Sequence, residues 1–204
     1  FVITFFASFF PSPETSNLSI AAYGIAIRIE QIILLPAIGL NFACLSLTGQ
    51  NFGAHKYHRI REGYLISLKY GLILMLCGSL LLYFGGGYFM RIFTEDINVI
   101  NIGQHYLKIA ALFAPMIPII NISIALMQGV KQPNYTVFIS LFKEVIGAVI
   151  IFWILCFYLN YKLEGLWIGI LIVNYLSVII FLFIVNNQMK SLGLEIFRRK
   201  LPPN

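Results

Sequence analysis

The chain has 204 residues, of which 59% are hydrophobic and only 11% are charged, and its mean hydropathy is +0.86. A soluble globular domain carries about 25% charged residues, so this composition excludes one. The formal charge of +6 does not indicate a nucleic-acid partner, because the basic residues lie mainly in short gaps between apolar runs. We therefore expect a polytopic all-α membrane helix bundle, with roughly 20 apolar residues per span.

The first apolar run covers residues 1–10 and ends at Pro11-Ser12-Pro13-Glu14. It is too short to span and has no initiator Met, so we expect it to be the tail of a truncated helix. The first complete span is predicted at about residues 17–48, with Ser16 or Asn17 as its cap. Pro36 and Gly39 lie inside it and predict a bend, which membrane helices tolerate.

Four more spans follow. The second covers about residues 63–84, is ended by Gly85-Gly86-Gly87, and precedes an amphipathic interfacial stretch from Tyr88 to Phe93. The third is predicted at about residues 103–127, with bends at Pro115 and Pro118, the fourth at about 135–159 and the fifth at about 164–188. The tail from Lys190 to Asn204 is polar and basic.

Lys and Arg are distributed unequally between the two sides of these spans. If the spans alternate, one side holds eight of them: Lys56, Arg59, Arg61, Lys131, Lys190, Arg198, Arg199 and Lys200. The other side holds two, Arg91 and Lys162, both close to acidic residues. Because Lys and Arg accumulate in cytoplasmic loops, we expect the 49–62 loop and the carboxyl end to be cytoplasmic.

Ionisable residues lie inside two of the predicted spans. By the rise of a helix, Glu30 lies roughly 20 Å, and the Lys143-Glu144 pair roughly 14 Å, from the start of its span. A charge at mid-membrane costs about 2.5–3.5 kcal/mol on insertion scales, so such residues usually face a cavity or a partner. We interpret Arg28, Glu30, Lys143 and Glu144 as candidate substrate- or cation-binding residues; structural ion pairs are the alternative.

The spacing of these charges limits how they can pair. Arg28 and Glu30 are two residues apart and point to different faces of a helix. Lys143 and Glu144 are adjacent and diverge by about 100°, so we expect at least one of them to find a partner on another helix. The candidate pairs are Glu30 with Lys143 and Arg28 with Glu144.

Mid-span amides form a second group of candidates, since amides bond across membrane helices or line cavities; we single out Asn121 and Asn174. In the loop 48–54, Gly49 and Gly53 permit a tight helix exit, and Gln50 and Asn51 can cap free carbonyls. A phosphate cradle is not expected there, because Lys56 is not followed by Ser or Thr. Neither the histidines nor the cysteines have metal-ligand spacing, and no catalytic set is recognised, so we predict no metal, no cofactor and no enzyme.

Several ordered segments resemble one known family. They are Ala21-Ala22-Tyr23-Gly24-Ile25 with Arg28-Ile29-Glu30, Leu35-Pro36-Ala37-Ile38-Gly39-Leu40, Gly49-Gln50-Asn51-Phe52-Gly53-Ala54, Leu126 to Pro133, and Gly165-Leu166-Trp167-Ile168-Gly169. Together they resemble the multidrug and toxic compound extrusion (MATE) family. The resemblance implies that residues 1–190 form the second six-helix lobe of a twelve-helix, two-lobe carrier, from the end of helix seven to helix twelve. Residues 191–204 would then be a cytoplasmic tail.

The resemblance also implies a function and partners. It implies an antiporter that exports organic cations, drugs or other amphipathic compounds by alternating access, in exchange for Na⁺ or H⁺. The partners would be the amino-terminal lobe of the same polypeptide, the lipid bilayer and a small organic cation. One branch of the family uses a helix-ten Asp for cation binding, but residues 116–128 hold no carboxylate. Glu30 and Glu144 are therefore candidates on physical grounds alone.

Two other functions remain open. A lipid-linked oligosaccharide flippase of the related superfamily would need a cationic cavity for pyrophosphate, which Arg28, Lys108 and Lys143 could supply. Alternatively the chain alone is a non-transporting structural fragment, because half a carrier should not transport.

Overall fold

The computed structural model describes residues 13–158 and 162–191, and this part of the chain is helical. The α-helices are α2 (Pro13–Gly53), α3 (Tyr57–Phe93), α4 (Ile97–Phe113), α5 (Met116–Gly129), α6 (Pro133–Leu141), α7 (Gly147–Trp153) and α8 (Lys162–Ser191). Two π-helical turns, η1 (Phe142–Ile146) and η2 (Ile154–Tyr158), join α6 to α7 and extend α7. The predicted helix tail at residues 1–10 and the basic tail beyond Ser191 lie outside the described residues.

Four continuous helical stretches are long and apolar enough to cross a membrane: Asn17–Gly53, Tyr57–Phe93, Pro133–Cys156 and Ile168–Ser191. The pair α4 and α5, bent by 53° at its break, is a fifth if its two helices form one span. Large apolar side chains cover the outside; Phe84, for example, is 74% exposed. A lipid environment explains such a surface, because hydrocarbon does not penalise exposed apolar groups as water does. The chain is thus an all-α membrane helix bundle with four to five candidate spans, and the sequence predicted five complete ones.

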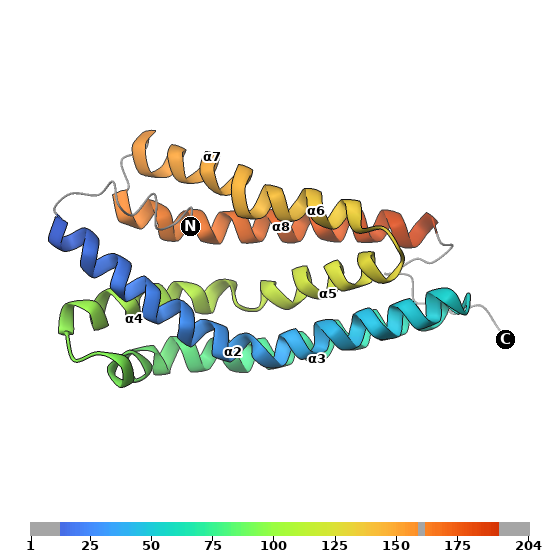
Figure 1. Ribbon diagram of the computed structural model, residues 1–204, viewed down its shortest axis with the longest axis horizontal. Coiled ribbons are helices and arrows are strands. Elements are labelled where there is room, and N and C mark those ends of the chain that lie inside the picture. The colour runs from blue at the N-terminus through green and yellow to red at the C-terminus, as the bar shows by residue number, and fades with distance from the viewer. Residues whose placement is uncertain (1–12, 159–161, 192–204) are drawn as a thin grey trace.

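The spans alternate in direction. Figure 1 shows the α2–α3 connection, the α5–α6 connection and the end of α8 at one end of the bundle, and the α3–α4 connection at the other. The first group carries Lys56, Arg59, Lys131 and Lys190, whereas the α3–α4 connection carries Glu95 and Asp96 beside Arg91. The basic loops that the sequence assigned to one side therefore lie at one end of the molecule.

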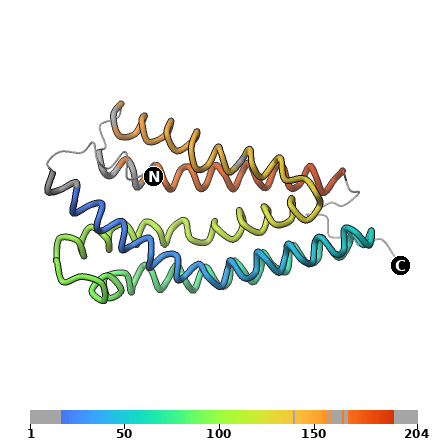
Figure 2. Tube along the Cα trace, in the orientation of Figure 1, coloured from blue at the N-terminus to red at the C-terminus, as the bar shows by residue number. Residues whose placement is uncertain are grey.

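Helix α2 differs from its prediction at both ends. It begins at Pro13, so Ser16 and Asn17 lie inside the helix and the predicted cap is wrong; proline is well suited to a first helical position because it lacks an N–H. Pro36 lies inside the helix, and the ribbon changes direction about midway along it (Figures 1 and 2). The other end runs through the predicted loop to Gly53.

The end of α2 is closed by its backbone. His55 has a positive φ of 57°, the Lys56 N–H donates to Asn51 O at 2.9 Å, and the His55 N–H donates to Phe52 O at 3.1 Å. This is the Schellman pattern, in which the last carbonyls of a helix find donors just beyond it. Asn51 bonds a carbonyl as expected, but within the helix, through Nδ2 to Leu47 O at 2.8 Å.

Helix α5 ends in the same way. Lys131 has a φ of 60°, and the Gln132 N–H donates to Met127 O at 2.9 Å. The two ends are packed together, because a Cβ added to Gly129 would lie 2.5 Å from the Thr48 side chain. Glycine is therefore required at this contact.

Helix α3 continues through its three glycines to Phe93, so the predicted end at Gly85 and the separate interfacial stretch are wrong. The glycines serve packing instead. A Cβ added to Gly86 would lie 3.2 Å from Leu107 Cβ, and one added to Gly87 would lie 3.0 Å from the Gln104 amide. Small residues let membrane helices approach closely, and here they bring α4 against α3.

The break between α4 and α5 is held by two hydroxyls. Pro115 has no N–H, so the Ala111 carbonyl lacks its usual donor four residues on. The Ser79 hydroxyl of α3 donates to this carbonyl at 2.6 Å. The Tyr175 hydroxyl of α8 donates to the next carbonyl, Leu112 O, at 3.4 Å. A neighbouring helix thus satisfies the carbonyl that Pro115 frees, as a kink inside a membrane requires.

Candidate functional site

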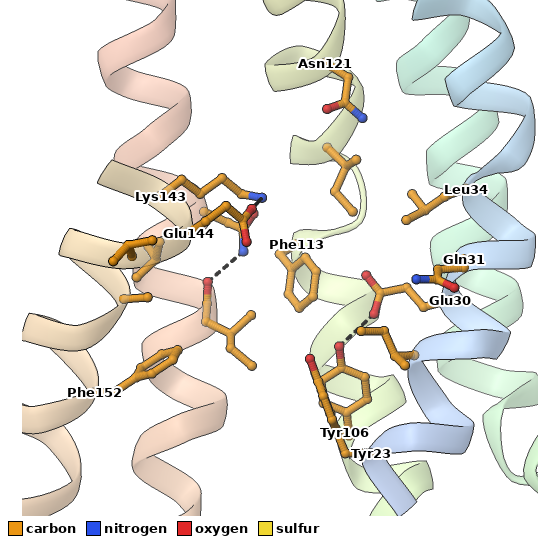
Figure 3. Close-up of a pocket in the computed structure, with 17 residues that line it drawn as sticks. Tyr23, Glu30, Gln31, Leu34, Tyr106, Phe113, Asn121, Lys143, Glu144 and Phe152 are labelled. Atoms are coloured by element: carbon orange, nitrogen blue, oxygen red, sulfur yellow. Dashed lines mark hydrogen bonds and ion pairs between the residues drawn. The ribbon is translucent and has the colours of Figure 1, made fainter. Parts of the chain in front are cut away.

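A half-open cavity of about 680 Å³ lies between the helices of the bundle. Its walls come from α2, α4, α5, η1, α7 and α8. The lining residues are Tyr23, Ile27, Glu30, Gln31, Leu34, Tyr106, Phe113, Ile117, Asn121, Lys143, Glu144, Val145, Ala148, Phe152, Ile170, Val173 and Asn174. Figure 3 shows Glu30 on one side of this space and Lys143 and Glu144 on the opposite side.

Glu30 is buried on the α2 side, with 8% of its surface exposed. The Tyr106 hydroxyl from α4 donates to Glu30 Oε2 at 2.7 Å. The Tyr23 ring meets the Tyr106 ring edge-on, with centroids 5.2 Å apart and an interplanar angle of 82°. Hydrogen bonds to a charged group contribute about 1.5–3 kcal/mol, so Tyr106 holds the carboxylate in a defined position. The arrangement presents a carboxylate and two aromatic rings to the cavity, as Figure 3 shows.

The two tyrosines were missed at the sequence level. Tyr23 lies seven residues before Glu30, which is about two helical turns and hence the same face of α2, so helical spacing could have identified it. Tyr106 lies 76 residues from Glu30, and no local pattern links the two.

Lys143 and Glu144 pair with each other on the η1 side. Lys143 Nζ lies 2.8 Å from Glu144 Oε1, and the two side chains are 28% and 68% exposed. The expectation that one of them must pair with another helix is therefore wrong, and among the described residues the candidate pairs Glu30–Lys143 and Arg28–Glu144 are not formed in this structure. The physical reason is reach: two long, flexible side chains close the angle between adjacent helical positions.

Both candidate amides line the cavity. Asn174 is 7% exposed, and its Nδ2 donates to Ile170 O at 2.8 Å, one turn earlier in α8. Asn121 lies on α5 and is partly exposed. The kink also contributes, since Phe113 and Ile117 stand on either side of Pro115 and both line the wall.

The other predicted residues lie elsewhere. Arg28 is exposed and is not among the lining residues, because it stands on another face of α2 from Glu30. Gly49, Gln50, Asn51 and Gly53 lie at the end of α2, and Gln50 Nε2 donates to Ser46 Oγ at 3.2 Å. Pro118 is buried, and its ring packs close to Gly71 of α3. Within residues 13–158 and 162–191, no cluster of three His, Cys, Asp or Glu side chains could hold a metal ion.

Comparison with known proteins identifies the family. The MatE family model matches residues 1–153. This chain belongs to the MATE transporter family. This match confirms the family resemblance seen in the sequence motifs. MATE proteins are membrane transporters and not enzymes.

Curated relatives of this MATE chain are bacterial. The probable multidrug resistance protein NorM of Bacillus cereus is 26% identical over 157 residues, which are 77% of this chain and 35% of the relative. The probable NorM of Thermotoga maritima is 27% identical over 162 residues, covering 74% and 32%. The MATE chain therefore spans about a third of the length of these relatives.

Solved structures show the same fold. An inward-facing MATE transporter of the MOP superfamily superimposes with a TM-score of 0.85 at 20% identity, covering 95% of this chain and 44% of that one. The MATE transporter ClbM in complex with Rb⁺ gives 0.84 at 19% identity, with coverages of 94% and 43%. The described helices thus form part of a MATE transporter fold.

Proposed function

We propose that this chain is one lobe, the second, of a secondary active antiporter that exports organic cations or other amphipathic compounds. An inward flow of Na⁺ or H⁺ drives the export by alternating access. The observation that carries the proposal is the cavity with the buried Glu30 at its wall, inside a bundle of apolar spans. An ionisable residue at membrane depth marks an ion or substrate pathway unless a structural partner neutralises it.

The chemistry of the lining supports a cationic ligand. Glu30 and Glu144 supply two carboxylates against the single ammonium of Lys143, so the lining carries one net negative charge when all three are ionised. The aromatic rings of Tyr23, Tyr106, Phe113 and Phe152 also line the cavity, and ring faces attract cations. A monovalent cation, organic or inorganic, would balance the remaining charge.

The same lining argues against the flippase alternative. That function needs several free cations around a pyrophosphate, and Arg28, Lys108 and Lys143 were the candidates. Arg28 and Lys108 are exposed and do not line the cavity, and Lys143 is paired with Glu144.

From the distribution of basic loops we propose that the basic end of the bundle faces the cytoplasm. We further propose a bacterial plasma membrane as the location and the other lobe of the carrier as the partner.

Transport by the intact protein in proteoliposomes tests the proposal. With ethidium as the exported dye, Na⁺ and pH gradients are applied in turn. Glu30→Gln should abolish gradient-driven efflux, because the neutral amide no longer exchanges a cation. Glu62→Gln is the matched control, since Glu62 is exposed on α3 and does not line the cavity. Unchanged efflux in Glu30→Gln with both gradients would show that Glu30 is not the coupling group. Scrambling of a fluorescent lipid pyrophosphate instead of dye export would favour the flippase.

A further inference from the structure

We infer that Lys143 is a tethered counter-ion that exchanges between Glu144 and Glu30, and thereby competes with the transported cation for Glu30. This inference rests on the proposed role of Glu30 in cation coupling. It assigns a further residue that sets how tightly the coupling cation is held.

Lys143 and Glu30 reach the same space from opposite walls. Lys143 comes from η1 and Glu30 from α2, and both line the cavity (Figure 3). The structure holds the Lys143 ammonium on Glu144 at 2.8 Å while Tyr106 donates to Glu30. One ammonium thus has two carboxylates within the same cavity.

The charged and titratable groups around Glu30 are few. Tyr23 stands on its own helix, Tyr106 on α4, and Lys143 and Glu144 on η1. The other polar lining side chains are amides: Gln31 on α2, Asn121 on α5 and Asn174 on α8. Among the lining residues, Lys143 alone therefore brings a fixed positive charge that could replace a bound cation at Glu30.

Burial sets the direction of the exchange. Glu30 is 8% exposed, whereas the Glu144 side chain is 68% exposed. Breaking a buried pair leaves an uncompensated charge at high cost, while an exposed pair contributes little. An ionised Glu30 without a cation should therefore draw Lys143 away from Glu144. When a cation or a proton occupies Glu30, Lys143 should return to Glu144, the partner at 2.8 Å in this structure.

The backbone under Lys143 is suited to such a movement. Residues 142–146 form a π-helical turn, in which the Gly147 N–H donates to Phe142 O. A Cβ on Gly147 would lie 2.8 Å from that same oxygen, so glycine permits the wide turn. Single π-turns inside helices occur frequently at functional sites, and the four-carbon stem of lysine is flexible.

The test measures the apparent affinity of the intact protein for Na⁺ and for H⁺, through the concentration that half-maximally drives ethidium efflux. Lys143→Gln removes the competing ammonium, so the apparent affinity for the coupling cation should rise. Glu144→Gln removes the alternative partner of Lys143, so Lys143 should stay on Glu30. The apparent affinity for the coupling cation should then fall. Couplings between two ligands typically give 5- to 150-fold changes, and we expect each shift in that range. The double variant should behave like Lys143→Gln, because no competitor remains.

Controls separate this inference from the function on which it rests. Lys108→Gln removes an exposed cation that does not line the cavity, and should leave the affinity unchanged. If Glu30→Gln abolishes coupling but neither Lys143→Gln nor Glu144→Gln moves the affinity, the counter-ion role is wrong and the proposed function stands. Shifts of the same sign in the two single variants would also overturn it. If Lys143→Gln does not fold, the opposite shifts expected of Lys143→Met and Glu144→Gln, measured by calorimetric titration of purified protein with NaCl and acid, decide the matter.

Discussion

Removing the Ser79 hydroxyl should destabilise the bundle only because Pro115 is present. Ser79 Oγ donates to Ala111 O at 2.6 Å, and this carbonyl lacks a helical donor because Pro115 has no N–H. An unsatisfied buried acceptor costs about 1–3 kcal/mol, and hydrogen bonds between membrane helices average about 0.6 with a maximum near 1.7 kcal/mol. We expect Ser79→Ala to cost about 1 kcal/mol.

A double-mutant cycle isolates this contribution. Pro115→Ala restores an N–H that can donate to Ala111 O, so Ser79→Ala in that background should cost close to nothing. The free energy of unfolding is measured by titrating the purified intact protein from mild detergent into denaturing detergent. Tyr175→Phe is the comparison: its bond to Leu112 O is 3.4 Å long and exposed, so its loss should cost clearly less. An equal cost of Ser79→Ala in both backgrounds would refute the account of the kink.

Three other predictions follow from contacts already described. Gly71→Ala places a Cβ 2.9 Å from the Pro118 ring and should lower stability by about 1–3 kcal/mol, whereas Gly39→Ala on open α2 surface should raise it by about 0.5–1 kcal/mol; detergent titration compares the two. Lys131→Gly relieves a φ of 60°, so it should stabilise the fold by about 1–2 kcal/mol and raise the melting temperature. Lys56→Gly, at a φ of −92°, should not raise the melting temperature. Tyr106→Phe removes the donor to Glu30 and should reduce gradient-driven efflux about tenfold, while Tyr70→Phe, exposed on α3, serves as its control; equal rates in both would contradict the role of the Tyr106 hydroxyl.

Helix positions were largely predictable because a bilayer imposes a simple rule on sequence. Each backbone group must be satisfied within the lipid, so apolar runs of sufficient length become helices. The break near Pro115 was predictable for a related reason, since proline cannot donate to the preceding turn. The end of α3 was not, because the run 85–87 looks like a helix terminator in isolation. It becomes a packing surface only when Leu107 and Gln104 of α4 are placed against it.

The candidate site divides along the same line. The presence of Glu30, Lys143 and Glu144 within apolar spans was enough to select them, because charge at membrane depth is costly. Their partners were decided by tertiary packing. The Tyr106 hydroxyl donates a hydrogen bond to Glu30, which is 76 residues away in the sequence. Lys143 forms its ion pair with the adjacent Glu144, although Glu30 lines the same cavity. Arg28 was selected by the same rule as Glu30 and lies outside the cavity.

By itself, the sequence determined the membrane environment, the all-α class, the gathering of basic loops at one end of the bundle and the family, because hydropathy, loop charge and ordered motifs are local properties. Only the tertiary structure decided that Tyr23, Tyr106 and the η1 turn share a cavity with Glu30. Pairing and burial depend on which helices lie side by side. In a bundle of near-uniform apolar helices, small residues such as Gly86 and Gly129 determine which helices pack closely against each other. Their packing partners, Leu107 and Thr48, lie far away in the sequence.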